Sequence, residues 1–212
     1  MNPRLILSLH SSKVVALSVA LLGLFVAVCA VGMLSSTAQS TEERVLEDKT
    51  PAHLPIKVKL KKEKEKAFKD LQNEKWARDF ELEVTNTADK PIYFLALQLI
   101  LPEIKSTDGY PIGFTLKYGR IELIDLGAPL QPQDTPILPG QTYVFKLSDK
   151  EAKGWEAFAA EEKLPKTEPK KVLLQFYILN FGDGTGFQTK IGMPFPKSNN
   201  KGFIIFSLTS KM

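Results

Sequence analysis

The feature that most constrains the fold of this chain is a repeated pattern of short segments in which apolar and polar residues alternate, with turn residues between them. Ile56, Val58 and Leu60 alternate with lysines, which is the period of a strand with one buried face. Similar segments occur at 80–84, 114–118, 121–126, 143–147, 187–191 and 203–208. Short strands at this spacing predict a mainly β fold, an antiparallel β-sandwich.

Two longer apolar runs, Ile92–Leu101 and Val172–Asn180, are expected to form central strands. A turn sequence, Asn86–Pro91, precedes the first run, and Pro102 ends it. A strand that is apolar at nearly every position is typical of one that is covered on both faces.

One α-helix is predicted between the strands. Ser148 and Glu151 form a capping box, S-x-x-E, in which each side chain binds a free backbone amide at the helix start. Apolar residues then fall on one face and Pro165 ends the helix, so we expect one inserted α-helix over about residues 149–163. The stretch 63–71 is either a second helix or a solvated loop.

Residues 57–66 contain six lysines together with Glu63 and Glu65. Such a stretch either contacts an anionic polymer or lipid headgroups, or lies on an edge strand, where lysines prevent pairing with other sheets. The acidic residues within the stretch favour the edge strand.

An apolar run without a charged residue, Val14–Leu34, follows Arg4 and Lys13 near the N-terminus. Such a helix is long enough to span the bilayer hydrocarbon core of about 30 Å. The positive charges predict an N-terminus inside the cell and a domain on the extracytoplasmic side of the cell membrane. Residues 1–38 are therefore either a retained signal anchor, which the length favours, or a signal peptide cleaved after Ala38, which would leave the protein secreted.

Residues 39–55 are polar, contain Pro51 and Pro55, and are predicted to form a flexible stalk. Residues 56–212 would then form the β-sandwich domain, because a chain of 212 residues holds one domain and a short additional segment. The only cysteine, Cys29, lies in the apolar run, so thiolate and disulfide chemistry is not expected in this domain.

Two segments, LEVTNTADKPIYFLALQL (residues 82–99) and LPGQTYVFKL (residues 138–147), resemble bacterial exported immunoglobulin-like domains with adhesion or accessory roles. In those domains an N-x-x-x-K-P turn joins two core strands, and a P-G-x turn opens a later one. The resemblance covers about Asp79–Ile191 and implies an immunoglobulin-like sandwich with the helix as an insertion. It implies no functional residue, and the disulfide and core-tryptophan pattern of antibody domains is absent.

Composition excludes several classes of function. Both histidines, His10 and His53, lie outside the predicted domain, so Ser-His-Asp and Cys-His catalysis is not expected there. The formal charge of +4 gives no strong attraction to nucleic acid, and glycine motifs for nucleotides are absent. We therefore expect no enzyme, no cofactor and no metal. A hydrolase using carboxylates such as Glu81 and Glu83 is the less favoured reading, because both residues lie on the outward face of a strand.

The sharpest local motif is NFGDGTGF, residues 180–187, between two predicted strands. Its glycines allow positive φ, and Asp-Gly is typical of a tight hairpin. The motif is either a plain hairpin with packed aromatic residues or a binding loop on a rigid scaffold. The candidate binding residues are Asn180, Phe181, Asp183, Thr185 and Phe187. The side-chain oxygens of Asn180, Asp183 and Thr185 could bind calcium, but the spacing departs from that of a calcium loop.

The sequence favours a non-catalytic extracytoplasmic binding or interaction module, membrane-anchored through Val14–Leu34 or secreted, with a protein or an envelope polymer as its partner. The alternative is a structural or accessory subunit of an envelope complex, in which residues 203–208, FIIFSL, would pair with another chain by strand addition. Nucleic acid is not expected as a partner.

Overall fold

The two long apolar runs form the two longest strands, β4 (Phe94–Lys105) and β7 (Lys171–Asn180), which pair in the antiparallel sense. They lie at the centre of a six-stranded sheet, as predicted, in the order β5-β4-β7-β8-β9, and β1 pairs with the first half of β7. The other strands of this sheet are β1 (Val45–Asp48), β5 (Pro111–Tyr118), β8 (Gly186–Gln188) and β9 (Met193–Phe195).

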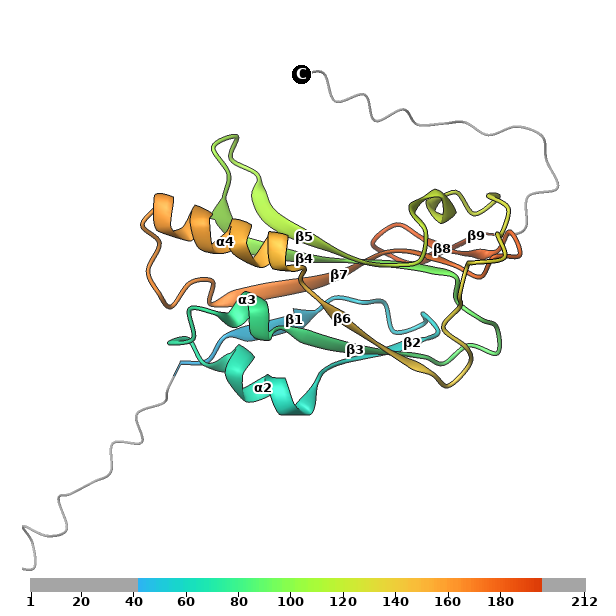
Figure 1. Ribbon diagram of the computed structural model, residues 1–212, viewed down its shortest axis with the longest axis horizontal. Coiled ribbons are helices and arrows are strands. Elements are labelled where there is room, and N and C mark those ends of the chain that lie inside the picture. Colours follow the sequence, from blue (N-terminus) through green and yellow to red (C-terminus); the bar gives the residue numbers. More distant parts are fainter. Residues whose placement is uncertain (1–41, 196–212) are drawn as a thin grey trace, which may run out of the picture. The chain divides into compact units, whose positions relative to one another are not determined.

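Three of the alternating segments form a second sheet, in the order β2 (Ile56–Leu60), β3 (Glu81–Asn86) and β6 (Thr142–Lys146). The computed structural model describes residues 42–195, and within them the two sheets face each other in a mainly β, largely antiparallel sandwich (Figure 1). β2 is an edge strand, as the lysine pattern indicated.

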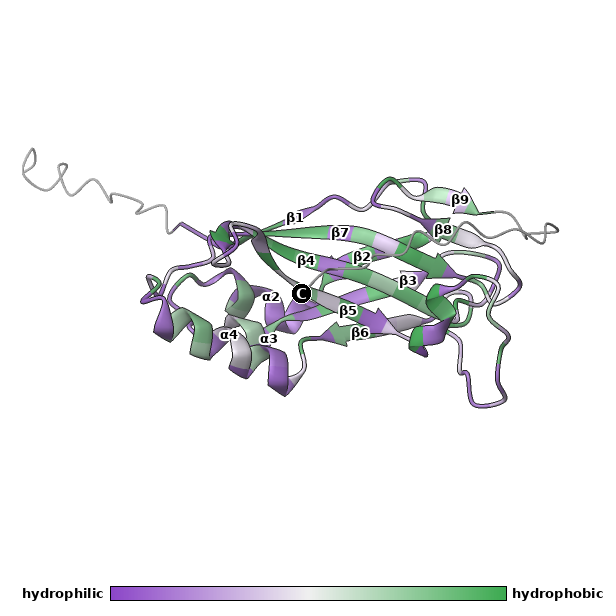
Figure 2. Ribbon diagram, turned by 90° about the horizontal axis from the view of Figure 1, so that it is seen from above, coloured by the Kyte–Doolittle hydropathy of each residue, from purple (hydrophilic) through white to green (hydrophobic). Residues whose placement is uncertain are grey.

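Inward-facing side chains from both sheets form one apolar core, and apolar residues dominate the central strands (Figure 2). The core residues from the strands include Leu82, Val84, Leu95, Leu97, Leu99, Leu101, Phe145, Val172, Leu174 and Phe176. On β4 these are alternate residues, because successive side chains of a strand point to opposite faces.

The outer face of β4 and β7 is covered at one end by a 3₁₀ turn, η1 (Ile121–Ile124). A strand was predicted over residues 121–126, and this prediction was wrong. Leu123 and Leu126 are both buried beside Phe94 of β4. Their spacing of three residues matches the period of a 3₁₀ helix, in which residues i and i+3 lie on one side.

On the outer face of the smaller sheet, charges pair across the strands. Glu81 of β3 accepts a hydrogen bond at 2.7 Å from Lys61, which directly follows β2, and forms an ion pair with Lys146 of β6 at 2.9 Å. Hydrogen bonds from Lys146 and then Lys61 lower the pKa of Glu81 to about 2. Glu83 pairs with Lys59 at 2.8 Å in the same way. Such cross-strand pairs stabilise neighbouring strands of the sheet.

The predicted inserted helix is α4 (Asp149–Glu161), and its capping box is formed. The Glu151 amide donates to Ser148 Oγ at 3.2 Å, and the Ser148 amide donates to Glu151 Oε2 at 2.8 Å. Ala152 and Trp155 bury the apolar face of the helix against the core.

The expectation of a single helix was wrong, because residues 42–195 hold three α-helices. α2 (Lys62–Lys69) falls in the stretch that the sequence left open between helix and loop. α3 (Trp76–Asp79) is one turn long and was not predicted. Its first residue, Trp76, is fully buried, so packing rather than local sequence holds this turn. The three helices lie towards one end of the sandwich (Figure 1).

The prediction of a flexible stalk over residues 39–55 was wrong for its described part. β1 pairs with β7 in the parallel sense, which is also an exception to the predicted antiparallel pairing. Leu46 packs against the core and Arg44 is fully buried. One partly buried apolar residue in a largely exposed stretch is too short a pattern to indicate a strand, and the pairing partner lies far away in the sequence.

The predicted apolar helix at 14–34 and the predicted strand at 203–208 lie outside the described residues. Among residues 42–195, none of the helices is both long enough and apolar enough to cross a bilayer.

Candidate functional site

The edge strand β2 has a set of free backbone groups that can be assigned from its pairing with β3. The Lys61 amide donates to the Glu81 carbonyl at 2.9 Å, so these two residues form a hydrogen-bonded pair. Bonded residues alternate along an antiparallel pair, and the odd-numbered residues of β2 therefore bind β3. The amides and carbonyls of Ile56, Val58 and Leu60 point away from β3, towards the open edge.

A second free edge belongs to β1. The amides of Val45 and Lys49 donate to carbonyls on the β7 side at 2.9 and 2.8 Å. Alternate residues of a strand point to opposite edges, so the backbone groups of Leu46 and Asp48 point away from β7. Within residues 42–195, no strand pairs with the outer edge of β1 or of β2.

A groove with a volume of about 670 Å³ opens between these two edges and α2. Its apolar lining includes Leu46 and Leu174 on the side of the larger sheet, and Val58 and Leu60 on β2. These side chains belong to the core or pack against it. The groove therefore places core-facing apolar side chains beside unpaired strand backbone.

Charged residues of both signs surround this groove. At its rim these are Glu43, Asp48, Lys59, Lys62, Glu65 and Lys69, and the buried Arg44 lines the groove from within. Two of the lysines are paired with acids: Lys59 with Glu83 at 2.8 Å, and Lys69 with Glu65 at 2.7 Å. A rim of balanced charge offers no site for a strongly acidic or strongly basic ligand, so the backbone and the apolar lining are the groups that would select what binds.

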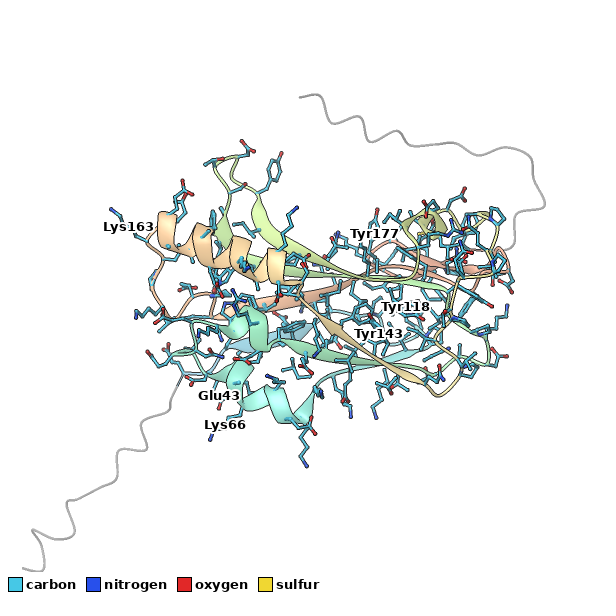
Figure 3. All side chains as sticks on the ribbon, viewed as in Figure 1. Glu43, Lys66, Tyr118, Tyr143, Lys163 and Tyr177 are labelled. Carbon is cyan, nitrogen blue, oxygen red and sulfur yellow. The ribbon has the colours of Figure 1, made fainter. Side chains whose placement is uncertain are left out.

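The opposite edge of the sandwich, between β5 and β6, is closed by aromatic rings. Tyr118 of β5 and Tyr143 of β6 stack edge to face with their ring centroids 4.6 Å apart (Figure 3). The Tyr118 hydroxyl donates to the Thr135 carbonyl at 2.6 Å. Burial raises the pKa of Tyr118, as expected for a phenol between two sheets. Aromatic side chains thus close the edge between β5 and β6, whereas the edge between β1 and β2 opens into the groove.

The wall of the groove beside α2 is fixed by the buried side chain of Arg44. Its Nε donates to the Pro169 carbonyl at 2.9 Å, and its Nη1 donates to the carbonyls of Phe68 and Asp70 at 2.6 and 3.0 Å. The last two carbonyls lie at the C-terminal end of α2, where free carbonyls favour a cation. One side chain therefore joins the start of β1, the end of α2 and the loop before β7.

The guanidinium of Arg44 is fully buried, and burial lowers its pKa to about 10. Its central carbon lies 5.3 Å from the ring centroid of Trp76 and 5.9 Å from that of Phe68. These aromatic faces, together with the three carbonyls, replace the water that the cation loses on folding. Among the described polar atoms, Arg44 Nη2 and Trp76 Nε1 are buried donors without a protein acceptor.

The first two residues of the predicted binding loop are buried. Asn180 is fully buried, and its Nδ2 donates to the Leu123 carbonyl at 2.8 Å, while its Oδ1 accepts from the Gly182 amide at 2.6 Å. Phe181 belongs to the core and stacks edge to face on Phe187 at 6.2 Å. Both side chains would have to leave these contacts to reach a ligand.

The other polar residues of the loop are bound to Lys90 from the turn before β4. Lys90 Nζ donates to Asp183 at 2.9 Å and to Thr185 Oγ1 at 3.3 Å, and lies 5.5 Å from the Phe181 ring centroid. Partial burial raises the pKa of Asp183, but hydrogen bonds from Thr185 and Lys90 outweigh it and lower the pKa to about 2. The structure brings all the predicted loop residues together, with the contacts of a tight hairpin.

Several carboxyl groups within residues 42–195 are held ionised by neighbouring cations. Wherever the pKa of one of them clearly departs from its usual value, it is lowered, and the group accepts a hydrogen bond from a lysine or an arginine. A catalytic acid needs the opposite shift, which keeps a proton available near neutral pH. In the same residues, no three His, Cys, Asp or Glu side chains cluster as metal ligands would.

Sequence reasoning found the edge strand of the groove but not the groove itself. The alternation of lysine and apolar residues in β2 was the available signal. The opposite wall comes from β1, which was assigned to the stalk, and from Leu174 in the centre of β7. Lys90, which holds the 180–187 loop, was also missed, because it lies more than ninety residues from that loop in the sequence.

No family model matches this chain, and no curated protein or solved structure shows significant similarity to it.

Proposed function

We propose that this protein is a non-catalytic interaction module that binds an extended segment of a partner protein by strand addition at β2. The observation that carries this proposal is the unpaired edge of β2 beside an apolar groove of about 670 Å³. The outward amides and carbonyls of Ile56, Val58 and Leu60 would supply the main-chain hydrogen bonds. In strand addition, such bonds give affinity, and pockets for alternate side chains give specificity.

The chemistry of the groove favours a polypeptide over a polymer of sugars as the partner. Its backbone donors and acceptors repeat at the spacing of a strand, about 7 Å for every second residue, which only another extended backbone matches along its length. Its lining of Leu46, Leu174, Val58 and Leu60 suits apolar side chains at alternate positions of that segment. The balanced charges at the rim do not select an anionic polymer.

The cellular location of this interaction is proposed from the sequence. The apolar run Val14–Leu34 and the basic residues before it support a domain on the extracytoplasmic side of the cell membrane, anchored there or released after Ala38. The immunoglobulin-like type of the sandwich stays a prediction, which two facing, largely antiparallel sheets support.

Site-specific crosslinking in intact cells tests this proposal. A photo-crosslinking residue placed at Lys62, which lines the groove, is expected to capture a protein partner through an extended, apolar segment identified by mass spectrometry. The same probe at Lys117, an exposed residue on the outer face of β5, is the matched control and is expected to capture no such segment. Equal capture at both positions, or capture at Lys117 alone, would contradict binding at the groove.

A further inference from the structure

We infer that the partner segment which adds to β2 alternates acidic and apolar residues, as β3 does on the other side of the same strand. This inference rests on the proposed function, because it names the chemical class of the segment that binds at that edge. It follows from the distribution of charge over the outer face of the smaller sheet and from the apolar lining of the groove.

Charge on the outer face of the smaller sheet is divided between its strands. The acidic residues of this face, Glu81 and Glu83, both lie on the central strand β3. The charged residues on the other two strands are all lysines: Lys57 and Lys59 on β2, Lys61 directly after it, and Lys146 on β6. The face therefore carries an excess of positive charge, and the free edge at β2 presents lysines alone.

One of these lysines has no acidic partner among residues 42–195. The other three pair with Glu81 or Glu83 at 2.7, 2.8 and 2.9 Å. Lys57 is exposed and lies opposite Thr85 of β3, whose hydroxyl forms a hydrogen bond with that of Thr142 at 2.7 Å. The first part of β2 thus presents a cation that is open to a carboxylate on an added strand.

A second unpaired lysine lies at the other end of the same edge. Lys62, the first residue of α2, lines the groove, is exposed and has no acidic partner within the described chain. The other charges at the rim of the groove are of both signs. Lys57 and Lys62 therefore place a free positive charge near each end of the strand edge, where an added segment begins and ends.

The strand already paired with β2 shows which sequence pattern fits beside it. β3 carries Glu81 and Glu83 on its outer face, and Leu82 and Val84 in the core. Glu81 is bound by lysines from both flanking strands, at 2.7 and 2.9 Å, so charges on this face accept partners from two sides at once. An ammonium group has three donors, and the lysines of β2 can therefore be shared with a second acidic strand in the same way.

The two faces of an added strand meet different surroundings. Successive residues of a strand point to opposite faces. Residues on the inner face of the added strand meet Leu46, Val58 and Leu174 in the groove, which favours apolar side chains. Residues on its outer face lie beside the lysines of β2, which favours carboxylates, because opposite charges on neighbouring strands attract. Alternation of acidic and apolar residues satisfies both faces.

The strand β2 of a second copy does not fit this edge. In a symmetric antiparallel pair of two β2 strands, odd-numbered residues lie opposite odd-numbered residues, and the odd-numbered residues of β2 are lysines. Like charges directly opposite each other destabilise a strand pair. The lysine face therefore favours a different strand, with acidic residues, as the occupant of the edge.

Peptide binding to the full chain in lipid nanodiscs tests this inference. The probe is a fluorescent peptide that copies β3, FELEVTN (residues 80–86), and the comparison peptide, FKLKVTN, has lysine in place of both glutamates. The acidic peptide is expected to bind about tenfold more tightly at low ionic strength, because each cross-strand charge pair changes from attraction to repulsion in the other. High salt is expected to reduce this preference, since it screens exposed charges.

Charge reversal at the two unpaired lysines locates the source of the preference. The double variant Lys57→Glu, Lys62→Glu is expected to lower the preference for the acidic peptide by about tenfold. The double variant Lys105→Glu, Lys117→Glu changes the net charge equally at exposed positions on β4 and β5, and is expected to leave the preference unchanged. Equal effects of the two variants would assign the preference to net charge and would overturn the inference.

The variant Val58→Pro separates this inference from the proposed function. It removes an amide that faces the open edge and is expected to abolish binding of the acidic peptide. Equal binding of the two peptides, lost in Val58→Pro, would overturn the inference and leave strand addition in place. Tighter binding of the lysine peptide, whose pattern is that of β2, would overturn it in favour of a second copy. Failure of both peptides to bind would also overturn it, while capture from Lys62 would still test strand addition.

Discussion

Replacing Arg44 by methionine is expected to lower the free energy of unfolding by about 3–5 kcal/mol, because three buried or partly buried carbonyls lose their donor at a cost of about 1–3 kcal/mol each. Methionine keeps much of the volume but donates no hydrogen bond. The carbonyls of Phe68, Asp70 and Pro169 would each lose a charged donor, and buried acceptors without donors are costly. The end of α2 and the start of β1 would separate first.

Chemical denaturation of the Arg44→Met variant measures this loss. Lys66→Met is the matched control, because Lys66 lies on α2, the helix whose end Arg44 binds, but is exposed. Its substitution is expected to change stability by no more than about 0.5 kcal/mol. Equal stability of the two variants would show that the Arg44 contacts are not needed to hold the chain before β1.

Replacing Trp76 by alanine is expected to cost a similar amount, about 3–5 kcal/mol, which is typical of removing a buried tryptophan from a core. Trp76 is fully buried and stacks edge to face on Trp155 of α4 at 5.6 Å and on Phe68 of α2 at 6.2 Å. Its loss would leave a cavity where the helices meet the sandwich. Arg44 would lose an aromatic face as well, so the two substitutions are not expected to be additive.

Thermal unfolding followed by circular dichroism is a suitable measurement for Trp76→Ala. Tyr110→Ala is the control, because the side chain of Tyr110 is 74% exposed in the turn between β4 and β5. A transition temperature unchanged in both variants would contradict the role of Trp76 in joining the helices to the sheets.

Local signals in the sequence predicted the elements that depend on local interactions. The capping box of Ser148 and Glu151 lies within one turn of chain, and α4 begins where it indicates. The alternation in β2 and the long apolar runs of β4 and β7 record which faces of each strand are buried. The strand patterns were sufficient to predict β2, β4 and β7 because each of them covers at least five residues.

Elements that depend on distant contacts were not predictable in this way. β1 is held by pairing with Lys171–Leu174 and by the bonds of Arg44 to residues 68–70 and 169, all remote in the sequence. A lone arginine in a polar stretch normally indicates solvent exposure. η1 was predicted as a strand because the apolar residues at 121, 123, 124 and 126 fit both the two-residue period of a strand and the three-residue period of a 3₁₀ helix.

In the candidate site, too, local features could be predicted from the sequence, and features that depend on distant contacts could not. The glycines of residues 180–187 correctly indicated a tight turn, but the sequence does not show that Asn180 and Phe181 are buried or that Lys90 binds Asp183. The groove needs two edges from different sheets, and whether an edge is free depends on the order of strands, which no local pattern specifies.

The most direct measurement compares two proline substitutions in the crosslinking experiment from Lys62. Val58→Pro removes an amide that faces the groove, whereas Val144→Pro removes one that faces away from β3 on the opposite edge of the same sheet. Neither amide bonds to β3, so both variants are expected to remain folded. Strand addition at β2 predicts that Val58→Pro abolishes capture and Val144→Pro preserves it. Undiminished capture by a folded Val58→Pro variant would contradict it.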